Sequence, residues 1–298
     1  MTEAASQERL NGPRSSGGLS PAATLTRATE YLARHGVDAP RRTAEILLMR
    51  VLKTDRAGLY RRREGLNSTE ARLFGRLLCQ RCTGTPLQYV VPEQQFMDLV
   101  LETKPGVFVP RPETEQLVEA ALEVLAGGPA EPIVVDVGTG TGAIALAIKR
   151  FTSGARVLAT DISLDAVNLA QANADRLNLD IGIRHGDLLD PLPSELRGRV
   201  DLLVSNPPYI GLEEYESLPS EVKAEPYEAL VGGIEFHRRL ADSALEWLAP
   251  GGWLMTEIGA GQGNEVKRLF AELLDRVEVL KDLAARDRVV RGSLKKLA

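Results

Sequence analysis

The side chains best suited to binding chemistry lie in one short turn. The turn ends an apolar run over residues 200–204 and consists of Ser205, Asn206, Pro207, Pro208 and Tyr209. The run is typical of a buried parallel strand, and the prolines end it because neither can donate a ladder hydrogen bond. The turn combines an amide side chain, two carbonyls without a competing N–H, and an aromatic ring. The oxygen atoms can accept hydrogen bonds from the N–H groups of a planar ligand, and the aromatic ring can stack against it.

The predicted position of this turn is the carboxyl edge of a parallel sheet, where ligands bind in open α/β folds. A Pro-Pro-Tyr sequence also fits a stiff exit loop without a function, because short motifs often match by chance. A second motif upstream favours the binding site.

The second motif is a glycine-rich turn between an apolar strand and an apolar helix. The strand covers residues 134–137 and contains Asp136, and the turn is Gly138, Thr139, Gly140, Thr141 and Gly142. Glycines allow a tight turn and let a ligand approach the main chain without a Cβ in the way. The next strand, residues 155–160, ends at Asp161, about twenty residues on, where a carboxylate that binds ribose hydroxyls is expected. This order of elements predicts a cofactor site.

Two classes of cofactor fit this unit, dinucleotides and S-adenosylmethionine. The spacing Gly-x-Gly-x-Gly after Asp136 is typical of methyltransferases, whereas the dinucleotide fingerprint would place Ala143 at its third glycine, which it tolerates. Asp187 and Leu188 follow a third strand, residues 181–184, at a turn that in methyltransferases typically lines the adenine pocket. A helix N-cap or Asx turn is the structural alternative for Asp187. The predicted cofactor-binding residues are Asp136, Gly138, Thr139, Gly140, Thr141, Gly142, Asp161, Asp187, Leu188 and Asn206.

Further segments make the chain similar to one family. They are Gly-Thr-Pro-Leu-Gln-Tyr (residues 84–89), Val-Phe-Val-Pro-Arg-Pro-Glu-Thr-Glu (107–115), Glu225-Pro226, and residues 282–288. With the two motifs above, the chain resembles the HemK-like release-factor glutamine methyltransferases over roughly residues 22–294. The turn at Asn206 is shared with adenine-N6 methyltransferases, but Pro-Arg-Pro-Glu-Thr-Glu is far more specific. Val91-Pro92 departs from relatives, which carry a glycine there, and leaves the local loop shape in doubt.

The resemblance implies an α/β fold: a Rossmann-like class I S-adenosylmethionine-dependent methyltransferase domain with a small N-terminal helical domain. It implies methyl transfer to the side-chain amide nitrogen (N5) of the glutamine in the Gly-Gly-Gln loop of peptide chain release factors. Asn206 and Pro207 would accept the two N–H bonds of that amide and Tyr209 would stack on it, with Pro208 in the same substrate-binding turn. Phe108 is expected to lie near the cofactor or in the core. Glu113 and Glu115 are expected in the first turn of a helix, where carboxylates favour the helix dipole. No metal is implied.

Length and composition allow two domains in an ordinary globular chain. It has 298 residues, of which 44% are hydrophobic and 26% charged, and no apolar run long enough to cross a bilayer. We therefore expect a cytoplasmic protein without a membrane partner. Residues 1–20 read as a disordered tail, 21–86 as a helical substrate-docking domain, 87–110 as a β-hairpin linker, and 111–298 as the catalytic domain. Strands are expected near residues 89–91, 96–101 and 107–109.

The charge of the chain is unevenly distributed. Residues 20–90 carry a net charge of +7, and residues 91–298 carry −12. A basic helical domain suggests docking of a negatively charged macromolecule, although Arg61, Arg62 and Arg63 also fit solvated helix faces. Nucleic acid is disfavoured as a partner because no aromatics interleave the basic residues and the pI is acidic. Cys79 and Cys82 form an isolated C-x-x-C without further zinc ligands, so we interpret them as incidental helix residues.

Three other functions compete. The first is a glutamine methyltransferase that acts on a ribosomal protein, and sequence motifs distinguish it only weakly from an enzyme that acts on release factors. An adenine-N6 nucleic-acid methyltransferase would stack a flipped base on Tyr209, but the chain after residue 257 has room only for a helix and a terminal hairpin. A non-catalytic adaptor with a vestigial cofactor fold disagrees with the intact glycines, Asp161 and Asn206.

Overall fold

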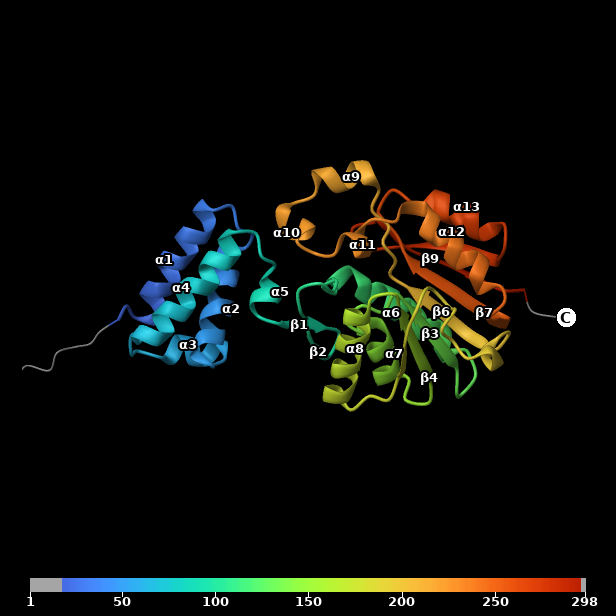
Figure 1. Ribbon diagram of the computed structural model, residues 1–298, viewed down its shortest axis with the longest axis horizontal. Coiled ribbons are helices and arrows are strands. Elements are labelled where there is room, and N and C mark those ends of the chain that lie inside the picture. Colours follow the sequence, from blue (N-terminus) through green and yellow to red (C-terminus); the bar gives the residue numbers. More distant parts are fainter. Residues whose placement is uncertain (1–17, 296–298) are drawn as a thin grey trace, which may run out of the picture. The chain divides into compact units, whose positions relative to one another are not determined.

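The computed structural model describes residues 18–295, which divide into two compact units at the boundary between Val91 and Pro92 (Figure 1). Most of the predicted N-terminal tail lies outside the described residues. Within residues 18–295, no helix has the length and apolar character needed to span a membrane.

The first unit is helical, as expected for residues 21–86. Its helices are α1 (Pro21–Arg34), α2 (Pro40–Leu52), α3 (Arg56–Arg61), α4 (Ser68–Cys82) and α5 (Leu87–Val90). Leu25, Ala28 and Leu32 repeat at helical spacing on α1 and pack in the core of this unit. Asn67 is the N-cap of α4, and with Glu70 it forms a capping box. Both cysteines lie on this helix.

Three strands expected between the domains are wrong in detail. Residues 89–91 are largely a helical turn, α5, because Pro86 starts it and the Val91 N–H closes it on the Leu87 carbonyl. The run 96–101 is two strands, β1 (Glu93–Phe96) and β2 (Leu99–Glu102), which pair antiparallel around a turn where Met97 has φ 53°. Residues 107–109 form no strand, because the Val109 N–H bonds to the Glu225 carboxylate instead of a neighbouring strand.

The second unit is built on a seven-stranded sheet in the order β5-β4-β3-β6-β7-β9-β8. The strands are β3 (Ile133–Val137), β4 (Arg156–Asp161), β5 (Gly182–His185), β6 (Val200–Ser205), β7 (Leu248–Glu257), β8 (Asp275–Lys281) and β9 (Asp287–Ser293). The first five in spatial order are parallel, and β8 and β9 form the expected terminal hairpin. Strand order reverses between β3 and β6, so ligands are expected at the carboxyl ends of these strands.

Helices cover both faces of this sheet, which confirms the predicted Rossmann-like α/β class (Figure 1). The helices α6 (Glu115–Ala126) and α7 (Ala143–Phe151) pack with Val134 in one core. The helices α12 (Gly233–Ala244) and α13 (Gly263–Ala271) pack with Val135 in the other. Adjacent strand residues face opposite layers because side chains alternate across a sheet. A further helix, α8 (Leu164–Leu177), follows β4.

Short helices complete the second unit. They are η1 (Pro112–Thr114), η2 (Ser194–Leu196), α9 (Leu212–Ser217), α10 (Ser220–Lys223) and α11 (Tyr227–Leu230). The first of these precedes α6, and the last three occupy the connection between β6 and α12.

Candidate active site

A cavity of about 650 Å³ opens where β3, β4 and β6 end. Most predicted site residues line it: Gly138, Thr139, Gly140, Thr141, Asp161, Asp187, Leu188, Asn206, Pro207, Pro208 and Tyr209. Phe108 and Arg111 also line it. Asp136 and Gly142 do not. The structure thus brings both predicted motifs to one cavity.

The glycine-rich turn needs left-handed backbone at all three glycines. Gly138, Gly140 and Gly142 have φ values of 72°, 57° and 84°, a region that favours glycine because a Cβ is disfavoured there. A Cβ on Gly142 would also approach Leu146 and Ala170 at 3.0 and 3.3 Å. Gly142 is therefore required for the turn and its packing.

Asp136 holds the turn from behind. It is fully buried, and its Oδ2 accepts hydrogen bonds from Thr139 Oγ1 (2.6 Å) and the Ala145 N–H (3.2 Å). Burial raises the pKa of Asp136 to about 7, against the lowering effect of these two donors. Its carboxyl therefore shapes the turn from outside the cavity lining.

Asp161 is the acid at the end of β4. Its carboxylate accepts the Gly140 N–H at 2.9 Å and the Ser163 N–H at 2.8 Å. Burial raises its pKa, and the two N–H bonds act against that rise. A carboxylate offers about four acceptor sites, so this residue can still accept hydroxyl hydrogen bonds from a ligand in the cavity.

Asp187 and Leu188 follow β5. The Asp187 carboxylate forms an ion pair with Arg239 at 2.6 Å, and Leu188 adopts a φ of 44°. Residues 187–190 form a turn rather than the start of a helix, so the N-cap alternative for Asp187 is wrong. Both residues face the cavity.

The turn at Asn206 is fixed at several atoms. Ser205 Oγ donates to the Val137 carbonyl at 2.7 Å, which ties the end of β6 to β3. Asn206 Nδ2 donates to Thr114 Oγ1 at 3.1 Å, so Oδ1 is the atom left to accept from a ligand. The Tyr209 hydroxyl donates to Glu257 Oε1 at 3.2 Å, and Gln262 Nε2 donates to the Tyr209 carbonyl at 2.7 Å.

Glu257 is a site residue that sequence reasoning missed. It ends β7 and is only 2% exposed. Burial raises its pKa to about 7, while hydrogen bonds from Thr114 and Tyr209 and the charge of Arg288 lower it. Burial and the neighbouring Glu257 raise the pKa of Tyr209. The available signal was its position at the end of an apolar strand, at the edge where the other site residues lie.

Arg111 and Glu225 connect two of the family-specific segments. They form an ion pair, and Glu225 Oε2 also accepts the Val109 N–H at 3.0 Å. Burial raises the pKa of Glu225, and the charge of Arg111 lowers it. The Arg111 guanidinium lies 5.1 Å from the centroid of the Phe108 ring, so the pair supports the wall that Phe108 contributes to the cavity.

The two predicted helical carboxylates have structural positions. Glu113 lies in η1 and Glu115 begins α6, where Glu115 Oε1 accepts the Met97 N–H of the β1–β2 turn at 2.7 Å. Asn173, which is fully buried, links the same hairpin to the glycine-rich turn: its Nδ2 donates to the Glu102 and Thr141 carbonyls at 3.1 and 3.0 Å. No local sequence pattern pointed to Asn173.

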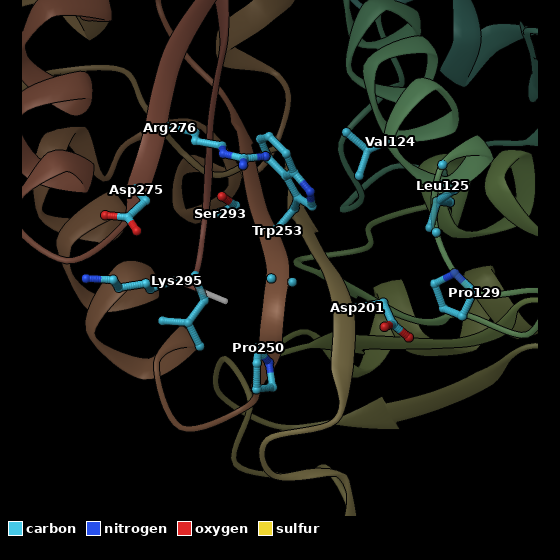
Figure 2. Close-up of a pocket in the computed structure, with 15 residues that line it drawn as sticks. Val124, Leu125, Pro129, Asp201, Pro250, Trp253, Asp275, Arg276, Ser293 and Lys295 are labelled. Carbon is cyan, nitrogen blue, oxygen red and sulfur yellow. The ribbon is translucent and has the colours of Figure 1, made fainter. Parts of the chain in front are cut away.

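A second cavity, of about 620 Å³, lies near the starts of β6 and β7 and the end of α6. Figure 2 shows Asp201, Pro250 and Trp253 among its lining residues. None of the predicted site residues lines it. The candidate chemistry is therefore confined to the carboxyl edge.

Comparisons with known proteins show what this chain is similar to. The model described as the PrmC N-terminal domain matches residues 23–91, and the methyltransferase small domain matches residues 98–223. A release factor glutamine methyltransferase of Moorella thermoacetica is 42% identical over 89% of this chain and 95% of its own length. One of Koribacter versatilis is 39% identical over the same shares. The 16S rRNA methyltransferase RsmC of T. thermophilus, solved with AdoMet and guanosine, is similar in fold: the TM-score is 0.50, with 22% identity over 68% of this chain and 50% of that chain.

Proposed function

We propose that this chain, which belongs to the family of release factor glutamine methyltransferases, transfers a methyl group from S-adenosylmethionine to the side-chain amide nitrogen (N5) of a substrate glutamine. The observation that carries the proposal is the Asn206 side chain, whose Nδ2 is taken by Thr114 and whose Oδ1 is left for an amide N–H. This acceptor lies in the cavity that the glycine-rich turn also lines.

The cofactor half of the cavity fits S-adenosylmethionine. A Cβ added to Gly138 or Gly140 would meet no atom within 4 Å, so a ligand can lie against this stretch of main chain. Asp161 keeps acceptor sites for ribose hydroxyls, and Asp187 and Leu188 would wall the adenine. The cofactor, when bound, supplies an activated methyl group on a sulfonium. Phe108 and Thr141 line the same cavity.

The role of the protein is to orient the side-chain amide of the substrate glutamine. An amide nitrogen is a poor nucleophile because its lone pair is delocalised into the carbonyl. Asn206 Oδ1 and the Pro207 carbonyl accept hydrogen bonds from the two N–H groups of this amide. These bonds turn the nitrogen lone pair out of conjugation and aim it at the methyl group. Tyr209 packs against the planar amide. Positioning of this kind supplies up to about 7–11 kcal/mol of a barrier, and the proton leaves after the nitrogen has been methylated.

A neutral acceptor at position 206 suits this step. An aspartate would accept the same hydrogen bonds, but its charge would have to be desolvated in the cavity. Asn206 avoids that cost. It therefore binds the amide without attracting a cation in its place.

The proposed substrate is the glutamine of the Gly-Gly-Gln loop of peptide chain release factors, because the relatives that match most of the chain are named for that substrate. The basic first unit, net +7 over residues 20–90, is proposed to dock the body of the substrate. The domain limits at residues 20, 86 and 110 and the cytoplasmic location remain predictions from the sequence.

The experiment that tests the function is an intact-mass assay. The protein and S-adenosylmethionine are incubated with unmethylated release factor, with a matched release factor whose loop glutamine is replaced by alanine, with ribosomal proteins, and with duplex DNA. One added methyl that fragmentation maps to the loop glutamine, absent from the alanine control, is the expected result. Methyl transfer to adenine or to a ribosomal protein, with none to the release factor, would overturn the assignment.

A further inference from the structure

Behind the Asn206–Tyr209 turn lie two buried side chains to which the proposed mechanism gives no role. Thr114 and Glu257 are each 2% exposed. Thr114 belongs to η1, in the Pro-Arg-Pro-Glu-Thr-Glu segment, and Glu257 ends β7. Both hydrogen-bond to residues of the turn, and Thr114 also lines the cavity.

We propose that Thr114 and Glu257 are positioning residues: Thr114 fixes the Asn206 amide with its oxygen rather than its NH2 group toward the substrate glutamine, and Glu257 fixes the Tyr209 side chain. The inference rests on the proposed function, since only an acceptor of N–H bonds needs this orientation. It assigns a task to the threonine of the family-specific segment.

The need for such a device follows from the symmetry of an amide side chain. Asparagine fits the same space in two orientations that exchange Oδ1 and Nδ2. The orientation with NH2 toward the substrate would offer donors to an amide that must itself donate two N–H bonds. The productive orientation therefore has to be selected by a contact on the far side of Asn206.

Thr114 supplies that contact. Its Oγ1 accepts from Asn206 Nδ2 at 3.1 Å. Nδ2 and Oδ1 project from opposite sides of the amide carbon, so this bond turns Oδ1 away from Thr114 and leaves it to accept from a ligand. A side chain without a hydroxyl at position 114 would lose that acceptor.

Glu257 acts on the other end of the turn. Its Oε1 accepts the Tyr209 hydroxyl at 3.2 Å, so it fixes the last residue of the turn. Its Oε2 is buried and has no hydrogen-bond partner among residues 18–295. A carboxylate that served packing alone would be costly in this place, which favours a role in ordering the turn.

The test compares Thr114→Val, which keeps the shape and removes the hydroxyl, with Thr114→Ser, which keeps the hydroxyl. Turnover and KM are measured with release factor as substrate, and cofactor affinity by calorimetry with S-adenosylmethionine. We expect Thr114→Val to lower kcat about 10- to 100-fold with cofactor Kd changed less than about twofold, in line with the loss of one oriented hydrogen bond. Thr114→Ser should restore kcat to within about threefold of the starting protein.

Glu257→Gln gives a second, independent measurement. Its neutral amide is a weaker acceptor for the Tyr209 hydroxyl than a carboxylate, so kcat should fall while thermal unfolding shows a folded protein. Unchanged kcat in Thr114→Val, or an equal loss in Thr114→Ser, would overturn the inference. Failure of the unsubstituted protein to methylate release factor would instead overturn the proposed function.

Discussion

Glu257→Gln should also change how the stability of the second unit depends on pH. Burial raises the pKa of Glu257 from 4.5 to about 7, even though Thr114, Tyr209 and Arg288 act in the opposite direction. The folded protein therefore holds this proton at pH values where the unfolded chain has already released it.

The sign follows from proton binding. Between pH 4.5 and about 7 the unfolded chain binds fewer protons at this site than the folded protein, so the free energy of unfolding falls as the pH rises through this window. One pKa unit corresponds to about 1.4 kcal/mol. The Glu257 carboxyl alone should lower the free energy of unfolding by roughly 2–3 kcal/mol between pH 5 and pH 8, and a glutamine should remove that contribution.

The assay is urea unfolding followed by tryptophan fluorescence. The two tryptophans of the chain, Trp247 and Trp253, both belong to the second unit, so the signal reports this unit. We expect the difference in the free energy of unfolding between Glu257→Gln and the unsubstituted protein to change by roughly 2–3 kcal/mol from pH 5 to pH 8. Glu272→Gln, whose side chain is 66% exposed, is the matched control. An equal difference at both pH values would refute the reasoning.

Four further variants test the roles proposed for the cavity and for the first unit. Asn206→Ala should abolish methyl transfer and leave cofactor affinity nearly unchanged, whereas Asp161→Ala should weaken cofactor binding first; equal loss of binding in calorimetry would contradict this division. Glu225→Ala removes the partner of Arg111 and should lower stability by about 1–3 kcal/mol and weaken cofactor binding, and a melting temperature like that of the unsubstituted protein would argue against it. Charge reversal at residues 61–63 should raise KM for release factor, and an unchanged KM would leave the docking proposal unsupported.

The cofactor half of the cavity could be predicted because its chemistry is local in the sequence. A strand, a turn with three glycines and a helix follow one another within residues 134–148, and Asp161 ends the next strand. Parallel strands bring their carboxyl ends to one edge, so this order alone placed Asp161 beside Gly140. Asp136 was the exception: sequence order could not indicate that its carboxyl faces Thr139 and Ala145 behind the turn.

The supporting residues could not be predicted because their contacts are long-range. Thr114 lies 92 residues from Asn206, and Glu257 lies 48 residues from Tyr209. No local pattern relates such pairs, and only the pairing of β7 with β6 brings Glu257 to the turn. The strands expected at residues 89–91 and 107–109 failed for a related reason: apolar β-branched residues favour strands, but Pro86 and the Glu225 carboxylate provided other backbone hydrogen-bond arrangements.

The placement of charge in the site follows from the chemistry proposed for it. The acceptor that would touch the substrate amide, Asn206, is neutral, and the buried carboxyl of Glu257 contacts the turn at Tyr209 instead. A carboxylate in direct contact with the amide would stabilise the cationic nitrogen that forms, but it would also be desolvated before any substrate bound. Because Asn206 Nδ2 donates to Thr114, the cavity presents a neutral oxygen. A hydroxyl can accept this bond, whereas the methyl groups of a valine side chain at position 114 could not.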